Sequence, residues 1–115
     1  MAVLVVQRII HTGLTPPTYA AAAGGGDSFV NDGRTFLHVK NAAAGGNSIV
    51  TINSLVNCDQ GVDHNLAVTI ADASESMIGP FAPSRFNDAN GSVAVTYSEV
   101  TGVTVAVLQL SQNGL

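Results

Sequence analysis

One short loop in this sequence contains four side chains that could bind a metal ion or form a reactive pair. The stretch NCDQGVDHN, residues 57–65, includes Cys58, Asp59, Asp63 and His64. Thiolate, carboxylate and imidazole are zinc ligands, and a thiol beside a histidine is the arrangement of a nucleophile with its base. The spacing matches no established ligand pattern, whereas aspartates commonly bond nearby backbone amides in turns. We therefore interpret the segment as a polar turn and expect no metal or other cofactor.

A second group of polar side chains stands in VNDGRTFLHVKN, residues 30–41. It holds Arg34 and Lys40, two of the four basic residues of the chain, together with His38. Asn-Asp-Gly is typical of a tight turn, and the residues after it alternate as in a strand. We interpret the stretch as a turn that leads into a strand. Its polar side chains are a candidate protein contact, and an ordinary solvated sheet face is the alternative.

A third candidate is the loop GPFAPSRFNDANG, residues 79–91. It places Phe81 and Phe86 on either side of Arg85. Aromatic residues and arginine are enriched at protein interfaces, which makes these three residues interface candidates. In the alternative interpretation both rings plug one end of the fold and Arg85 pairs with Asp88 or another nearby acid. The two interpretations are compatible, because a plugged loop still presents its arginine.

The sequence contains none of the common motifs of enzyme active sites that we searched for. It contains no Gly-x-Ser-x-Gly elbow, no phosphate-binding glycine loop, no Cys-x-x-Cys and no His-Glu-x-x-His. The net charge of -4 leaves no basic field for phosphates, so we expect no nucleic-acid partner. Cys58 is the single cysteine, which excludes a disulfide within this chain. A non-enzymatic role follows from these observations.

The low charge of the chain favours a protein whose surface contacts other proteins. Charged residues make up 10% of the sequence, against about 25% in a typical soluble domain. The apolar start, MAVLVVQRII, is interrupted at Gln7 and Arg8 and is shorter than the roughly 20 residues of a membrane span. It also lacks the charged start of a signal peptide. We interpret it as a structural element and expect no membrane partner.

The period of the hydrophobic pattern is two along most of the chain. Five segments show this alternation or a nearly continuous β-branched run, and ESMIGPF is a shorter candidate. The five are TFLHVKN, SIVTINS, NLAVTIA, SVAVTYS and VTVAVLQL. Turn sequences such as Asn31-Asp32-Gly33 and Asn90-Gly91 separate them. The pattern predicts one all-β domain over residues 1–115, an antiparallel sandwich or small barrel of about seven to eight strands.

The amino-terminal part is expected to form an arm. Residues 1–11 hold an apolar strand, and residues 12–27 form a connector rich in Pro, Ala and Gly. A strand on such a connector can pair with a neighbouring subunit instead of its own sheet. Val3, Val5 and Ile9 are therefore candidate interface residues.

Several of these segments resemble a family of small proteins encoded among the head genes of tailed bacteriophages. The resemblance covers residues 27–110 and rests on NDGRTFL, GPF, RFN, VTYS and the valine-rich carboxyl-terminal strand. It implies a capsid cement or decoration protein with a β-sandwich fold. Such a protein binds the outer surface of the icosahedral head and stabilises the contacts between major capsid subunits.

The resemblance also sets expectations for partners and location. The major capsid protein is the expected partner, a homodimer or homotrimer is the expected form, and the virion surface is the expected location after synthesis in the host cytoplasm. Two other roles stay open: a different virion component, such as a head-completion, tail or fibre-attachment protein, and a carbohydrate-binding or adhesin module. The second would use an exposed aromatic platform, for which the chain offers only Tyr19 and Tyr97 among its tyrosines and tryptophans.

Overall fold

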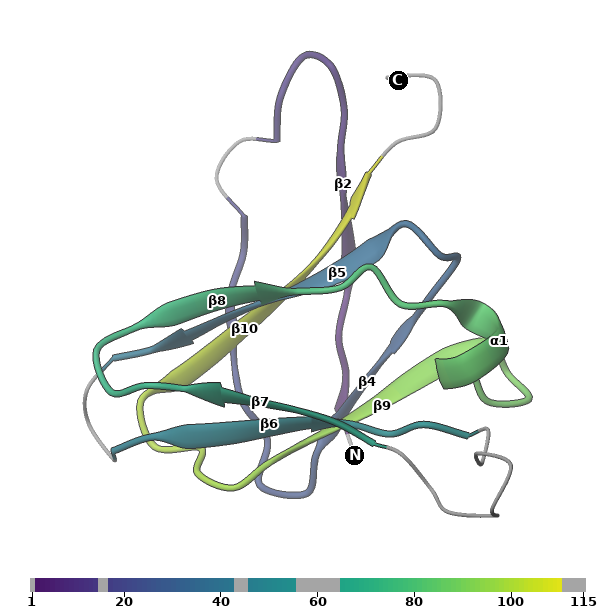
Figure 1. Ribbon diagram of the computed structural model, residues 1–115. Coiled ribbons are helices and arrows are strands. Elements are labelled where there is room, and N and C mark those ends of the chain that lie inside the picture. Colours follow the sequence, from purple (N-terminus) through teal and green to yellow (C-terminus); the bar gives the residue numbers. More distant parts are fainter. Residues whose placement is uncertain (1, 15–16, 43–45, 56–64, 111–115) are drawn as a thin grey trace.

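The computed structural model describes residues 2–14, 17–42, 46–55 and 65–110. Two sheets, called sheet A and sheet B below, pack against each other (Figure 1). Sheet A has the order β1-β4-β9-β6-β7, with β1 Ala2–Val3, β4 Asp27–Val30, β9 Ser92–Tyr97, β6 Ser48–Ile52 and β7 Leu66–Ile70. Sheet B has the order β2-β10-β5-β8, with β2 Val6–Ile9, β10 Val103–Leu110, β5 Thr35–Asn41 and β8 Glu75–Ile78. The short β3, Ala20–Ala21, also pairs with β10, and a single turn of helix, α1, spans Pro83–Phe86.

The core lies between the two sheets and follows the alternation of the sequence. Each strand sends every second side chain inward, because successive residues of a strand point to opposite faces. Leu37 and Val39 of β5 are fully buried in this way, and so are Val93 and Val95 of β9. The prediction of an all-β sandwich is therefore confirmed.

The strand inventory differs from the predicted one in three respects. The amino-terminal strand is divided into β1 and β2, and β3 and β4 are additional strands. β3 consists of two alanines, and β4 is a four-residue segment directly after a glycine run, so neither shows a readable period. The sheets are mixed rather than antiparallel, since β1 runs parallel to β4 and β2 runs parallel to β10.

The amino-terminal arm joins both sheets of its own chain. β1 pairs with β4 in sheet A, and β2 pairs with β10 in sheet B, so the arm crosses from one sheet to the other between Val3 and Val6. In Figure 1 the arm rises from the lower sheet to the upper one, where β2 and the end of β10 reach beyond the other strands. The arm therefore pairs with strands of its own chain, and its exchange between subunits stays a prediction.

The connector is part of sheet B rather than a free tether. β3 continues the line of pairing along the edge of β10, next to the residues paired with β2. Thr18, just before β3, is bound to Gln7 of β2. The side-chain amide of Gln7 donates to the carbonyl of Thr18 at 2.8 Å, and its oxygen accepts from the Thr18 N–H at 2.7 Å. Residues 17–22 are thus held against the arm and the sheet.

Candidate functional site

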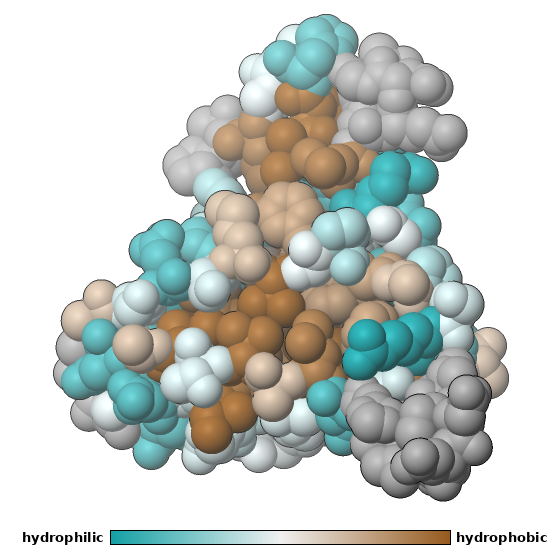
Figure 2. All heavy atoms as spheres, in the orientation of Figure 1, coloured by the Kyte–Doolittle hydropathy of each residue, from teal (hydrophilic) through white to brown (hydrophobic). Residues whose placement is uncertain are grey.

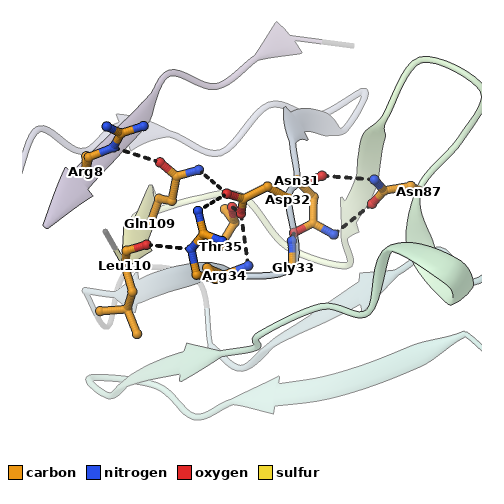
Figure 3. A network of polar contacts seen from close by, with 9 residues as sticks. All are labelled: Arg8, Asn31, Asp32, Gly33, Arg34, Thr35, Asn87, Gln109 and Leu110. Atoms are coloured by element: carbon orange, nitrogen blue, oxygen red, sulfur yellow. Dashed lines mark hydrogen bonds and ion pairs between the residues drawn. The ribbon is translucent and has the colours of Figure 1, made fainter. Parts of the chain in front are cut away.

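The turn between β4 and β5 is held by the side chain of Asn31. Its Oδ1 accepts the N–H of Gly33 at 3.0 Å, and its Nδ2 donates to the carbonyl of Phe81 at 3.0 Å and to Oδ1 of Asn87 at 2.7 Å. Asn87 returns a hydrogen bond from its own Nδ2 to the Asn31 carbonyl at 2.9 Å (Figure 3). The two most distinctive sequence motifs, Asn31–Leu37 and the loop 79–91, therefore bind each other.

Asp32 connects the same turn to sheet B. It accepts hydrogen bonds from the Arg34 N–H at 2.9 Å and the Thr35 hydroxyl at 3.2 Å, and it forms an ion pair with the Arg34 guanidinium at 2.9 Å. Gln109 of β10 donates to the second carboxylate oxygen at 2.8 Å and accepts from Nε of Arg8 at 3.2 Å (Figure 3). A continuous chain of polar contacts thus runs from the arm to the turn.

Arg34, one of the predicted interface residues, belongs to this network. Besides its ion pair with Asp32, its Nε donates to the carbonyl of Leu110 at 3.1 Å. Its side chain is still 40% exposed. The structural role of Arg34 is therefore clear, and part of its surface stays accessible to a partner.

The contacts of Asp32 predict a specific response to acid. Partial burial acts to raise the pKa of Asp32, but the Arg34 N–H, the Thr35 hydroxyl and the Arg34 charge together hold it below the ordinary value of 3.8. A carboxyl group whose pKa is lower in the folded state stabilises the fold above its unfolded pKa, and this contribution is lost as the pH falls through the folded pKa. We expect the stability difference between the wild type and Asp32→Asn to be constant near neutral pH and to shrink below about pH 4. Urea unfolding of both proteins across this range measures it, and a difference that grows with acidity would contradict the assignment.

His38 is buried although the sequence pattern places it on the outer face of β5. Its side chain bridges two segments: the Tyr19 hydroxyl lies 2.6 Å from Nδ1, and a carboxylate oxygen of Glu75 lies 2.9 Å from Nε2. The register explains the contact, because His38 pairs with Ala106, and the β3–β10 pairing continued by one residue places Tyr19 beside Ala106. One ring nitrogen of a neutral imidazole donates and the other accepts, which suits these two partners.

Lys40 completes this cluster on the outer face of sheet B. Its ammonium lies 4.1 Å from the centre of the Tyr19 ring, which is a cation–π contact. The polar face of β5 therefore meets the connector of the same chain. The sequence analysis considered Tyr19 only as a platform for a sugar and did not single out Glu75, because no local pattern joins residues so distant in the chain.

The loop 79–91 seals one end of the sandwich with its two phenylalanines. Phe81 and Phe86 are buried, with their ring centres 5.6 Å apart, and Phe81 also lies 5.6 Å from Phe29. Arg85 is exposed, and its guanidinium carbon lies 4.6 Å from the centre of the Phe86 ring. A contact surface formed by this loop would present Arg85 rather than the rings.

The arm presents its hydrophobic residues to solvent. Val3 and Val5 are 75% and 78% exposed, whereas Leu4 between them is buried in the core and Ile9 is half-buried. A groove of about 320 Å³ lies beside them, lined also by Thr18 of the connector and by β10. Figure 2 shows hydrophobic side chains over the middle of the visible face and along the part where β2 and the end of β10 lie. The predicted arm residues Val3 and Val5 are therefore at a surface that a partner can reach.

A buried carboxylate holds the other end of the connector. Asp27 is fully buried at the start of β4, where it accepts hydrogen bonds from the Tyr97 hydroxyl at 2.7 Å and the Ala23 N–H at 3.3 Å. Burial, followed by the neighbouring carboxylate, raises the pKa of Tyr97. The sequence analysis did not single out Asp27. Tyr97 lies at the rim of the core, as its place in an apolar strand predicts.

The loop with Cys58, Asp59, Asp63 and His64 lies outside the described residues. Within the part of the chain that the structure describes, no three His, Cys, Asp or Glu side chains gather as metal ligands do. No helix in that part is long and apolar enough to cross a membrane. Comparisons with models of known protein families, with characterised proteins and with solved structures returned no match for this chain.

Proposed function

We propose that this protein is a cement or decoration protein of a tailed-bacteriophage capsid. It binds the outer surface of the icosahedral head and stabilises the contacts between neighbouring major capsid subunits. The proposal rests on the resemblance of residues 27–110 to small phage head proteins and on the low charge of the chain. The observation that carries it is the exposed arm, with Val3 and Val5 beside an apolar groove.

The arm suits a contact with a large protein partner. Two exposed valines next to a groove offer apolar surface whose burial against a partner is favourable. The arm is also fixed to both sheets, so little conformational entropy is lost when it binds. A rigid apolar element of this kind can join two capsid subunits without any chemistry.

Carbohydrate binding is less well supported by the same geometry. The Tyr19 ring is half-buried, its hydroxyl contacts His38, and Lys40 covers the ring. Tyr97 lies at the core rim with its hydroxyl bound to Asp27. Neither ring is therefore a free platform on which a sugar could stack.

Capsids that lack the protein provide the test of the proposal. We expect the purified chain to bind such capsids and to raise their resistance to heat and shear. The variant Val5→Asp should weaken binding at least ~10-fold, because an exposed apolar side chain is replaced by a charge that would lose its water in the contact. Met77→Asp is the matched control: Met77 is 62% exposed on β8, away from the arm, and its replacement should leave binding unchanged.

Two results would overturn the proposal: no binding of the wild type with no change in capsid stability, or equal loss of binding in both variants. Electron microscopy of labelled virions would then locate the protein in the tail or at the head–tail junction if it is a different virion component.

A further inference from the structure

Among the described residues, the outward positions of the sheet A strands carry no charged side chain. The strand register gives the outward positions, and all of them in the five strands are Val, Ile, Ala, Ser or Thr. Ala94 and Thr96 of the central strand β9 and Thr51 of β6 occupy its middle. The only charged residue in the described strands of this sheet is Asp27, which is buried on the inner side.

The opposite sheet has a different outer surface. Its outward residues include His38, Lys40 and Glu75, which contact the connector or one another. The acids near sheet A stand at the ends of its strands: Asp72 follows β7, and Glu99 follows β9. An uncharged centre with a charged perimeter is the usual composition of a protein interface.

We infer that the outward face of sheet A binds the same face of a second copy of this chain about a two-fold axis. In such a pair the same surface of both copies forms the contact, so this surface must be complementary to itself. Ser and Thr hydroxyls meet this condition because each is both a donor and an acceptor of hydrogen bonds. Exposed Val30 and Ile49, near opposite ends of the face, add apolar contacts.

Charge also favours a second copy at this face. The chain has a net charge of -4, so two copies repel each other over most of their surfaces. The outward strand positions of sheet A let two copies meet with no ionised group at the centre of the contact. A strongly charged partner would instead bind a surface of opposite charge.

The size of the face sets the expected strength of the dimer. Strand spacing of about 4.8 Å and a rise of about 3.3 Å per residue give a flat area of roughly 350 Å² for the 22 residues of the five strands. This is less than half of the ~800 Å² that each partner contributes to a standard interface. The dimer is therefore weak and reversible, with a Kd in the micromolar range or above.

Sedimentation velocity of the full chain over a range of concentrations tests the inference. We expect a monomer–dimer equilibrium in the wild type, and a Kd raised at least ~100-fold in Thr96→Lys, because the new like charges face each other across the axis. Thr12→Lys is the control, since Thr12 is exposed at the far end of the arm and the added charge is the same. Both variants replace an exposed threonine, and circular dichroism confirms that they fold.

Salt gives a second, independent readout. Asp72, Asp88 and Glu99 stand at the ends of the sheet A strands, so their mutual repulsion across the dimer is screened by added salt. Raising NaCl from ~0.05 M to ~0.5 M should leave the dimer unchanged or strengthen it. A dimer that weakens in salt would overturn the inference in favour of a contact between opposite charges elsewhere.

The remaining outcomes also decide the question. A wild type that stays monomeric at ~1 mM overturns the inference, and so does a dimer that persists in Thr96→Lys. If the wild type is monomeric and Thr96→Lys loses capsid binding, the face belongs to the shell. The capsid-binding assay with Val5→Asp tests the proposed function, whereas sedimentation with Thr96→Lys tests the dimer. Either proposal can therefore be refuted while the other stands.

Discussion

Replacing Phe81 by alanine is expected to lower the free energy of unfolding by about 3–5 kcal/mol. The ring is 1% exposed and packs at 5.6 Å from the ring centres of both Phe29 and Phe86. Truncation removes its buried area and leaves a cavity, because neighbouring strands hold the surrounding residues in place. The loss is a large part of the 5–15 kcal/mol that stabilises a typical domain. Urea unfolding followed by circular dichroism at low temperature measures it.

Two further variants make the Phe81 prediction specific. Phe81→Leu keeps most of the volume and should cost about 1.5 kcal/mol, so it stays measurable even if the alanine variant does not fold. Met77→Ala removes an exposed side chain and should change stability by less than about 0.5 kcal/mol. A loss below about 1 kcal/mol in Phe81→Ala would mean that the ring does not plug this end of the sandwich.

Gly79→Ala is expected to destabilise the protein by about 2–6 kcal/mol through the backbone. Gly79 has a φ of +129°, a conformation that only glycine adopts without strain. A Cβ atom at this position would lie 2.8 Å from Cβ and 3.0 Å from Cα of Phe36, so β5 itself would have to move. The close approach of the two backbones is the physical reason for a glycine in the Gly-Pro-Phe motif.

Gly25→Ala is the matched control for this variant. An added Cβ there meets no atom within 4 Å, and no positive φ requires glycine. Its replacement should be neutral or stabilise the fold by up to about 1 kcal/mol, because alanine restricts the unfolded chain. Equal effects of the two substitutions in thermal unfolding would show that Gly79 is not constrained by β5.

These two expectations concern one contact between two segments of the chain. Phe81 and Gly79 belong to the loop 79–91, and both contact the segment Asn31–Leu37, through the Asn31 amide and the Phe36 backbone. The NDGRTFL, GPF and RFN segments therefore meet in one structural junction. Their role in this chain is to hold sheet B, the arm and the end of the sandwich together.

The predicted interface residues differ in how far the structure exposes them. Val3 and Val5 are exposed because they point away from the core that Leu4, between them, enters. His38 and Lys40 lie on the outer face of their strand as expected, but that face is covered by Tyr19 of the connector. The alanine-rich connector gives no sign of pairing, because two alanines have no detectable period and a strand pair so short depends on its neighbours.

The sequence by itself determined the class of fold and the division of side chains between core and surface. Both depend on the period of two, which is local: Leu37 and Val39 face inward wherever their strand is placed. The tertiary structure decided which outward residues meet water. Asn31 reaches Phe81 across 50 positions of sequence, and Tyr97 reaches Asp27 across 70. Contacts over such distances depend on sheet order and register, which no local pattern encodes.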